Sequence, residues 1–372
     1  MSAKGNKQKW TIIGGGNGGQ SMAGHLAIMG FPVKLYDIFP ETIEAIRKQG
    51  GIKVEGAVEG FGKLELATTD ISQALEGADI VIVVAPALAH KAIAKDCAPL
   101  LKDDQVIVLH PGSTFGVLEF KQTLVENDCY ADLVIAEAES LLYACRSKKP
   151  GHANILGVKE CLKVAAFPAK ENERVLKMLN TAFPQMYAGA NVLEVSLSNL
   201  NAMMHPGPTL LNTSLIESIH EWLYYWDGIT PSIGEFVEQM DKERLAVAEA
   251  LGIKLKSVGE MYKILYGVEG ESLSEAVKKN KAYEGVKGQK NIRTRYVLED
   301  IPMGLVPMVS LGKMLGIDVS RMETIVKLGE FLLDKDFTKE GRTVDKIGLI
   351  DMTPEEVINY VETGIRGQRA LA

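Results

Sequence analysis

The sequence predicts an α/β domain with a doubly wound, mostly parallel sheet over residues 1–185, followed by an all-α helical domain over residues 186–372. In the first half, short runs rich in β-branched residues alternate with helical stretches, and after about residue 185 only helix signals continue. The strands are apolar throughout rather than at every second residue, which is typical of a parallel sheet covered on both faces. A length of 372 residues also suits two domains of ordinary size.

The apolar runs of the first half each predict one strand. They read, in chain order, WTIIGG, PVKLYD, KLELATT, DIVIVVAPA, QVIVLHP, DLVIAEAES and LKVAAFPA. Between most of them lie helical stretches such as SMAGHLAIMG, PETIEAIRKQG and ISQALEGA. Strand and helix in alternation is the pattern of βαβ units, so neighbouring strands are expected to run parallel.

The second half shows helix starts. Thr230-Pro231 begins a helix that runs towards Gly252, because proline is well tolerated at the first helical position. Candidate Ser/Thr-x-x-Glu capping boxes mark further starts at Ser257–Glu260, Ser272–Glu275, Ser320–Glu323 and Thr353–Glu356. The last of these helices is expected to end near Gly364.

Composition excludes several classes of protein. A formal net charge of −7 argues against nucleic acid or an anionic membrane surface as the main partner, although a small anionic substrate remains compatible with it. The start, MSAKGNKQKW, leads straight into a strand, and the longest apolar run, IVIVVAPALA, is too short to span a bilayer. The four cysteines show no metal-ligand spacing. We therefore expect a reduced, cytoplasmic protein without a metal.

The first strand leads into a glycine-rich turn that opens a helix. Gly14, Gly16 and Gly19 stand in GxGxxG register, which permits a tight turn, close approach of a pyrophosphate and close packing of helix on strand. The free N–H groups of the helix N-terminus favour an anion there. This is the arrangement of a Rossmann-type dinucleotide-binding domain, and the candidate cofactor-binding residues of the turn are Gly14, Gly15, Gly16, Asn17, Gly18 and Gly19.

Other strand ends supply further cofactor-binding candidates. Asp37 follows the second strand about 20 residues on, where an acid binds the ribose hydroxyls. With no arginine beside it, Asp37 favours NAD over NADP, and NADP stays possible. Ala85, Pro86 and Gly112 follow later strands, where they either line the nicotinamide side or form ordinary turns.

His205 stands where a helix has to break. Pro206 disfavours helical geometry at the residue before it but is a good first residue of a new helix. A helix through EVSLSNLNAMM is thus expected to end at His205, and another to continue from Pro206 through TLLNTSLIESIHEWL. At such a junction the imidazole can point into a cleft, with Asn201 on the same face. The alternative is a hydrogen-bonded core histidine.

The segment NIRTRYVLEDIPMGLVP (291–307) gathers Arg293, Arg295, Glu299 and Asp300. Reduction of a 2-oxo acid needs an arginine to hold the carboxylate and a proton donor near the carbonyl oxygen, for which a histidine–carboxylate pair is the usual solution. The alternative is a surface charge cluster at a helix end.

Several segments together resemble the octopine/nopaline-type opine dehydrogenases. They are the GGGNGG turn, LLYACR (141–146), KVAAFPA (163–169), NAMMHP around His205, RYVLEDIPMGLVP and GRTVDKIGL (341–349). The resemblance extends over nearly the whole chain, and its late motifs are far more specific than the glycine turn. One departure is Ser113, at a position where many relatives continue with arginine.

The resemblance implies that an L-amino acid is condensed reductively with a 2-oxo acid such as pyruvate, with NADH or NADPH as hydride donor. It implies that His205 donates and accepts the proton, with Asp300 as its carboxylate partner. Arg295 would hold the oxo-acid carboxylate, Asn201 would position substrate or nicotinamide, and Cys145 would lie near the pocket, with simple packing as the better interpretation. The candidate substrate-binding residues are Arg295, Asn201, Met204, Thr209 and Cys145.

Two other functions remain open at this point. One is a 2-oxo acid or 3-hydroxy acid dehydrogenase of the same two-domain plan that acts without an amine. The other is a protein that binds NAD without turnover. Met203, Met204, Trp222 and Tyr225 favour an apolar amino-acid side chain over a basic one, unless they belong to the core. The helical domain also offers a surface for a homodimer.

Overall fold

The structure, a computed structural model, describes residues 7–366. Contacts divide the chain into two compact units: Met1–Val195 together with the C-terminal segment from Asn359, and Ser196–Ile358. The boundary expected from the sequence at residue 185 thus lies ten residues further on, and the segment that begins at Asn359 returns to the first unit. That return rests on ring packing, since Tyr360 meets Phe167 edge-on with centroids 4.9 Å apart.

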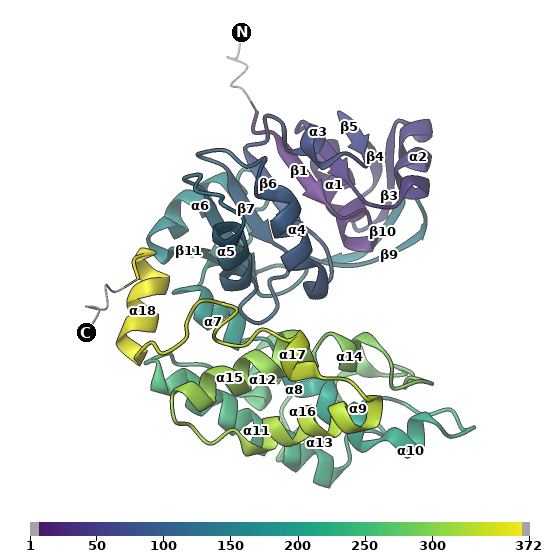
Figure 1. Ribbon diagram of the computed structural model, residues 1–372. Coiled ribbons are helices and arrows are strands. Elements are labelled where there is room, and N and C mark those ends of the chain that lie inside the picture. Colours follow the sequence, from purple (N-terminus) through teal and green to yellow (C-terminus); the bar gives the residue numbers. More distant parts are fainter. Residues whose placement is uncertain (1–6, 367–372) are drawn as a thin grey trace, which may run out of the picture. The chain divides into compact units, whose positions relative to one another are not determined.

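The first unit is built on the predicted sheet (Figure 1). Its strand order is β12-β11-β8-β7-β6-β1-β2-β5, and all neighbours are parallel except β11 and β8. The strands are β1 (Trp10–Ile13), β2 (Val33–Tyr36), β5 (Leu66–Thr68), β6 (Ile80–Val83), β7 (Val106–Leu109), β8 (Val134–Ala138), β11 (Leu162–Phe167) and β12 (Met186–Ala188). Every predicted run supplies one of them. Only β12 was missed, because it lies just beyond the point where strands were expected to stop.

Helices connect these strands as the alternation predicted. They are α1 (Asn17–Ile28), α2 (Pro40–Gln49), α3 (Ile71–Leu75), α4 (His90–Cys97), α5 (Gly116–Glu126) and α6 (Asn172–Leu179). The central strands β1, β6 and β7 are buried at every residue. Burial on both faces explains why their sequences are continuously apolar.

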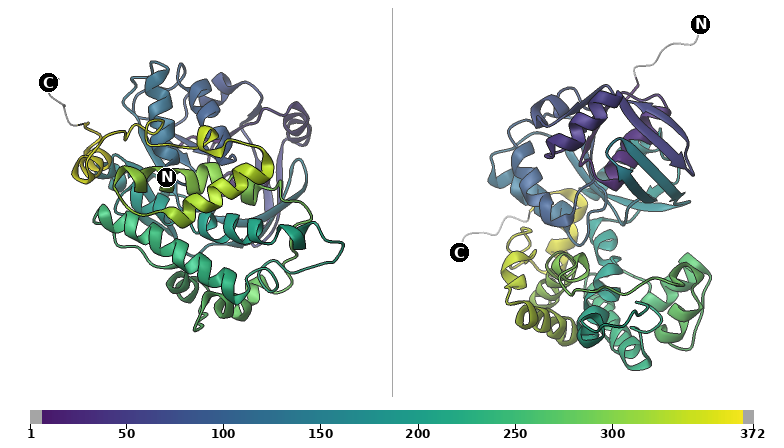
Figure 2. Two further views of the ribbon diagram at one scale, coloured as in Figure 1. Left: turned by 60° about the horizontal axis from the view of Figure 1, so that its bottom comes forward. Right: turned by 90° about the vertical axis from the view of Figure 1, so that its right-hand side faces the viewer.

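A second sheet was not predicted. Its order is β4-β3-β10-β9, formed by β3 (Gly51–Gly56), β4 (Gly60–Lys63), β9 (Tyr143–Lys149) and β10 (His152–Val158). These segments contain glycine and lysine and lack a continuous apolar run, so pairing between distant segments decides their structure. The sheet packs closely on α1, because a Cβ at Gly24 would lie only 2.6 Å from Val54 Cγ2. In Figure 2 the purple strands β3 and β4 lie beside the teal strands β9 and β10.

The second unit is helical. Its elements are the end of α7 (Val192–Leu197), α8 (Asn201–Met204), α9 (Pro206–Leu211), α10 (Thr213–Ile216), α11 (Pro231–Ala250), α12 (Val258–Tyr266), α13 (Leu273–Lys279), α14 (Arg295–Leu298), the π-helical turn η4 (Ile301–Leu305), α15 (Val306–Met314), α16 (Ser320–Leu333), α17 (Phe337–Glu340) and the start of α18 (Pro354–Thr363). Within residues 7–366 there is no helix long and apolar enough to cross a membrane.

The predicted helix starts are confirmed in part. Thr230 caps α11, and the reciprocal bonds of a capping box are present at Ser257–Glu260 and Thr353–Glu356. At Ser272–Glu275 only one of the two capping-box bonds forms: the Ser272 hydroxyl accepts the N–H of Glu275. The Glu275 carboxylate accepts the N–H of Glu271 rather than that of Ser272. A helix, α16, does begin at Ser320, but the capping box predicted at Ser320–Glu323 does not form, because Ser320 is the first helical residue and Asp318 accepts its N–H.

The helix expected to continue from Pro206 through residue 223 is shorter than predicted. α9 ends at Leu211 and α10 at Ile216. The Asn212 side chain donates to the carbonyl oxygens of Pro208 and Gly228, at 2.7 and 2.8 Å, which turns the chain. Beyond it Leu223 forms a bridge with Lys287. Long-range bonds therefore replace the helical ones.

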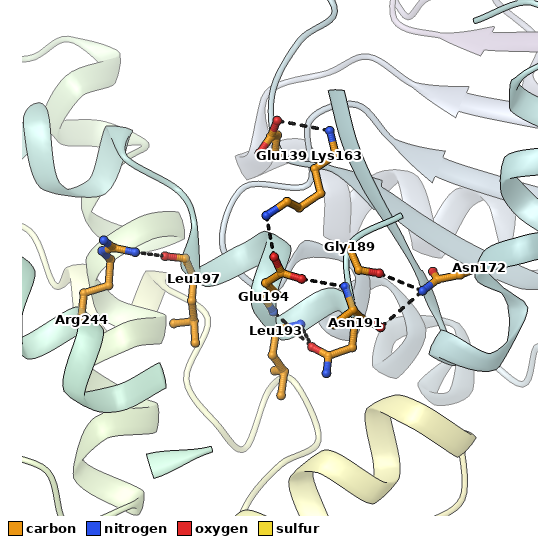
Figure 3. Close-up of polar contacts among 10 residues, drawn as sticks. Glu139, Lys163, Asn172, Gly189, Asn191, Leu193, Glu194, Leu197 and Arg244 are labelled. Carbon is orange, nitrogen blue, oxygen red and sulfur yellow. Dashed lines mark hydrogen bonds and ion pairs between the residues drawn. The ribbon is translucent and has the colours of Figure 1, made fainter. Parts of the chain in front are cut away.

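Helix α7 spans the boundary between the units and is anchored on each side (Figure 3). In the first unit, Lys163 Nζ lies 2.5 Å from a carboxylate oxygen of Glu194, and the Asn191 side chain accepts the N–H groups of Leu193 and Glu194. In the second unit, the buried Arg244 donates to the carbonyl oxygen of Leu197 at 2.8 Å. Both ends of this short helix thus have defined positions in their own unit.

Candidate active site

The glycine turn has the geometry of a phosphate cradle. Gly14 has a φ of +109°, and a Cβ there would lie 2.2 Å from the carbonyl oxygen of Val84. A Cβ at Gly19 would lie 1.7 Å from the Gly14 carbonyl oxygen. A Cβ at Gly16, in contrast, would meet nothing within 4 Å. The turn is therefore closed towards the protein and open at Gly16.

The N-terminus of α1 is electrostatically suited to an anion. Gly16 is its N-cap, no side chain caps it, and no acidic residue lies in its first turn. The unpaired N–H groups and the positive end of the helix dipole thus face the open side of Gly16. A dinucleotide pyrophosphate fits this arrangement.

Other residues of the turn hold it in place. The carboxylate of Asp37 accepts the N–H groups of Gly15 and Phe39 and is 8% exposed. Asn17 Oδ1 accepts the N–H of Ser147 at 2.9 Å, which ties α1 to β9. A Cβ at Gly18 would crowd the side chains of Val84 and Leu141. Asp37 and Asn17 therefore position the glycine turn through contacts within the protein itself.

The later strand ends differ in accessibility. Ala85 is half-buried and Pro86 exposed after β6. Gly112 is buried after β7, its N–H donates to Ala138 at 3.1 Å, and a Cβ there would lie 2.4 Å from Glu137 Oε2. Gly112 is thus required for packing of this loop on β8, whereas Ala85 and Pro86 lie at the surface.

His110, which the sequence did not single out, is buried in the same region. Burial lowers the pKa of His110 to about 3, with the charge of Lys159 adding to the effect. Its Nε2 accepts the N–H of Leu142 at 2.9 Å. A neutral imidazole therefore connects the end of β7 to the segment before β9.

In the helical unit the His205 junction forms as predicted. α8 ends at Met204 and α9 begins at Pro206. The His205 N–H donates to the Asn201 carbonyl oxygen at 3.0 Å. The imidazole Nδ1 lies 2.7 Å from Asp300 Oδ2, and the two residues are 8% and 3% exposed. A histidine and a carboxylate that are 95 positions apart are thus brought together.

The bond to Asp300 determines which ring nitrogen can react. A carboxylate accepts a hydrogen bond, so Nδ1 carries a proton and donates it. Among residues 7–366 the other nitrogen, Nε2, is bonded by no protein group. Nε2 is thus the atom that can donate or accept a proton, and Asp300 stabilises the charged imidazole.

Two tyrosines that the sequence did not assign hold the His205 junction, one through the imidazole ring and one through the backbone. The Tyr296 ring stacks on it with centroids 3.7 Å and planes 1° apart. The Tyr224 hydroxyl lies 3.0 Å from the carbonyl oxygens of Met204 and His205 and 3.1 Å from the Thr209 hydroxyl. Tyr296 precedes Asp300 by four residues, a helical spacing that signals a shared face. Tyr224 carries no such signal.

Asp300 lies at the point where α14 passes into the π-helical turn η4. Its N–H donates to the Arg295 carbonyl oxygen at 3.2 Å, and its own carbonyl oxygen accepts the N–H of Leu305 at 3.0 Å. Wide turns of this kind are frequent at functional sites. The turn directs the carboxylate towards His205.

The remaining substrate-binding candidates divide into exposed and buried residues. Arg295 is 62% exposed in its side chain, and its Nε lies 3.8 Å from Glu299 Oε2. Asn201 is exposed as well. Met204 and Thr209 are buried beside His205, whereas Cys145 is buried on β9 in the core of the first unit. Arg295 and Asn201 are thus accessible to a ligand, while Cys145 has a packing environment.

Comparison with known proteins agrees with both units. Residues 188–333 match the family model described as NAD/NADP octopine/nopaline dehydrogenase, alpha-helical domain, and residues 9–127 match the NAD-dependent glycerol-3-phosphate dehydrogenase N-terminus. An opine dehydrogenase from Arthrobacter sp. (strain 1C) is 39% identical over 354 residues, which cover 95% of this chain and 98% of that relative.

Solved structures show the same fold. Octopine dehydrogenase with NADH and L-arginine superposes with a TM-score of 0.80 at 22% identity, covering 98% of this chain and 100% of the other. Yersinopine dehydrogenase with bound NADP⁺ superposes with a TM-score of 0.76 at 14% identity, covering 94% and 99%. The predicted fold, a Rossmann-type sheet domain followed by a helical domain, is confirmed.

Proposed function

Because the chain belongs to the opine dehydrogenase family, an NAD(P)-dependent group of oxidoreductases that act on CH–NH donors, we propose that it joins an L-amino acid to a 2-oxo acid such as pyruvate. The amine adds to the carbonyl carbon, and the carbinolamine loses water to give an iminium. When bound, the reduced nicotinamide supplies the hydride that converts the iminium to a secondary amine. In sum, the ammonium form of the amino acid, the oxo acid, NADH and one proton give the opine, NAD⁺ and water.

The observation that supports this function is the 2.7 Å contact between His205 Nδ1 and Asp300 Oδ2. Loss of water from a carbinolamine needs a proton at the leaving oxygen, and we assign its delivery to Nε2 of His205. A positioned acid or base of this kind contributes roughly 10²- to 10⁴-fold. The amine must also lose a proton before it attacks, and the same nitrogen can accept it.

The cofactor fits the first unit. Gly16 leaves room for a pyrophosphate at the N-terminus of α1, and Gly14 and Gly19 keep the turn tight. Asp37 lies at the end of β2, where its carboxylate would favour the ribose hydroxyls of NAD over a 2′-phosphate. Ala85 and Pro86 would border the nicotinamide.

The exposed candidates suit the substrates. Arg295 has a guanidinium available to hold the oxo-acid carboxylate, since its contact with Glu299 at 3.8 Å is weak. Asn201, one helical turn before His205, would orient the substrate or the nicotinamide. Met204 and Thr209 would back His205 from the core, and packing on β9 is the role we infer for Cys145.

Two further inferences concern the setting of the enzyme. The helical unit exposes apolar side chains on α12, with Ile264 61% and Leu265 49% exposed, which supports a homodimer formed through this unit. All four cysteines are free, which supports a reducing compartment such as the cytoplasm.

The test is NADH oxidation with pyruvate alone and with pyruvate plus each amino acid in turn. Oxidation that requires both substrates, with a secondary-amine dicarboxylate detected by mass spectrometry, is the expected result. Oxidation with the oxo acid alone would instead identify a simple 2-oxo acid dehydrogenase, in which His205 protonates an alkoxide.

A further inference from the structure

The segment GRTVDKIGL (341–349), one of the motifs of the family resemblance, begins beside the π-helical turn η4. The N–H of Arg342 donates to the carbonyl oxygen of Pro302 at 3.2 Å. Two residues later, the N–H of Val344 donates to the hydroxyl oxygen of Ser310 at 3.0 Å. Residues 341–344 therefore dock on η4 and α15 through their backbone.

Pro307 explains why a residue far along the chain bonds Pro302. In the wide turn the carbonyl oxygen of Asp300 accepts the N–H of Leu305, five residues on. The same spacing would pair Pro302 with Pro307, which has no N–H to give. A buried carbonyl oxygen needs a donor, and the N–H of Arg342 supplies it from outside the turn.

Gly341 makes this close approach possible. A Cβ at Gly341 would lie 2.6 Å from the carbonyl oxygen of Pro302 and 2.7 Å from Val306 Cγ1. Its φ of −80° suits any residue, so the backbone conformation does not demand a glycine. The absence of a side chain at this position is therefore explained by the contact with η4.

The turn η4 also contacts the helix that leads to His205. A Cβ at Gly304 would lie 3.0 Å from the Cβ of Ala202, so η4 packs closely on α8, which ends one residue before His205. Asp300 is the N-cap of η4, and its Oδ2 lies 2.7 Å from His205 Nδ1. A displacement of η4 would therefore move Asp300 relative to His205.

We propose that Gly341 is a positioning residue of the active site: the docking of residues 341–344 on η4 holds Asp300 at hydrogen-bond distance from His205. The inference rests on the proposed function, in which this pair transfers the proton. Gly341 acts through steric fit and adds no group to the reaction. Its effect is expected to be large, since a misplacement of about 1 Å caused by a distant change can cost about 100-fold in rate.

The main variant is Gly341→Ala, which places a methyl group against the carbonyl oxygen of Pro302. We expect kcat with pyruvate and the best amino acid to fall about 10- to 100-fold, because Asp300 moves away from His205. The Kd for NADH should stay unchanged, because the glycine turn belongs to the other unit. Circular dichroism confirms that the protein compared is folded.

Proton NMR measures the contact itself. In protein with isotope-labelled histidine, the Nδ1–H signal of His205 is the one that His205→Ala lacks. We expect this signal to move upfield in Gly341→Ala, because a longer hydrogen bond to Asp300 deshields the proton less. A change in overall stability alone would not move it.

Gly234→Ala is the matched control. A Cβ at Gly234 would lie 3.0 Å from the backbone nitrogen of Ser274, so it crowds the contact of α11 with α13 rather than η4. This variant should lower the thermal unfolding temperature. Both kcat and the His205 signal should stay unchanged.

Ser310 provides a milder test that holds even if Gly341→Ala does not fold. Ser310→Ala removes the acceptor of the Val344 N–H and should lower kcat about 2- to 10-fold, the effect of one hydrogen bond. Ser310→Thr keeps the hydroxyl, and the cavity of about 240 Å³ that Ser310 lines has room for the added methyl group. Ser310→Thr should therefore keep kcat and the His205 signal near their original values.

The outcomes separate the positioning role from the function. Unchanged kcat and an unchanged His205 signal in folded Gly341→Ala overturn the positioning role, as does an equal loss of kcat in Gly234→Ala. Equal losses in Ser310→Thr and Ser310→Ala overturn it too. Absence of NADH oxidation by the unaltered protein with every amino acid overturns the proposed function, and the His205 signal then decides the positioning of Asp300 by itself.

Discussion

The His205 imidazole lies flat against the Tyr296 ring, with centroids 3.7 Å apart, while its Nδ1 contacts Asp300 at 2.7 Å. Tyr296 lies in α14, and Asp300 follows four residues later, just beyond the end of this helix. One short stretch of chain therefore holds the imidazole by its face and by its edge. No protein group among residues 7–366 bonds the other ring nitrogen, Nε2, which is the atom that we propose transfers the proton.

Replacing His205 is expected to separate chemistry from cofactor binding. His205→Ala should lower kcat by about 10²- to 10⁴-fold, because the proton donor is removed. The affinity for NADH, measured by fluorescence titration, should stay unchanged, because the phosphate cradle belongs to the other unit. Asp300→Asn should lower kcat as well, since an amide does not stabilise the charged imidazole. Loss of NADH affinity together with turnover would contradict this role for His205.

Tyr296 is expected to act as a positioning residue. Tyr296→Leu removes the flat surface under His205 and should lower kcat by about 10- to 100-fold, because small displacements of a catalytic group are costly. Tyr296→Phe keeps the ring and should restore kcat to near the original value. If Phe and Leu reduce kcat equally, the hydroxyl rather than the stacking matters, and the positioning role is wrong.

The open side of Gly16 predicts a selective effect on the cofactor. Gly16→Ala should fold normally, since its Cβ would meet nothing within 4 Å and its φ is −72°, yet it should raise the Kd for NADH at least about 10-fold by occupying the pyrophosphate space. Gly259→Ala, which also meets nothing within 4 Å, should leave the Kd unchanged. Gly19→Ala should destabilise the fold. An unaltered Kd in Gly16→Ala would place the pyrophosphate elsewhere.

Arg295 is expected to affect the oxo acid more than the amine. Arg295→Lys keeps the charge but loses the bidentate geometry, so the KM for pyruvate should rise about 10-fold. The KM for the amino acid should change little. Initial rates with each substrate varied in turn distinguish the two, and a selective rise for the amino acid would assign Arg295 to the other carboxylate.

His110 is expected to make the protein sensitive to mild acid. Its pKa is about 3 in the folded protein and about 6.5 when unfolded, so below pH 6.5 the unfolded state binds a proton that the folded state does not. Stability should therefore fall as the pH drops, by about 2 kcal/mol between pH 7 and 5. His110→Gln, which keeps an acceptor for Leu142, should lose this part of the pH dependence in urea unfolding. The exposed His220→Gln variant should keep it.

Features that depend on neighbouring residues could be predicted from the sequence. The strands of the first sheet are continuously apolar, the GxGxxG turn demands glycine locally, and Pro206 ends one helix and begins the next. Each of these signals lies within one stretch of chain, so local sterics and burial are sufficient to produce the structure.

The remaining features arise from long-range contacts, which have no signature in a single stretch of sequence. The second sheet forms when β3 pairs with β10, and the segment that begins at Asn359 returns to the first unit where Tyr360 meets Phe167. His205 and Asp300 could be named separately from the sequence, but their contact and the stacking of Tyr296 arise from packing of α9 and α14 in one unit. The proposed chemistry depends on the distances between these residues, and these distances are set by the folding of the whole unit.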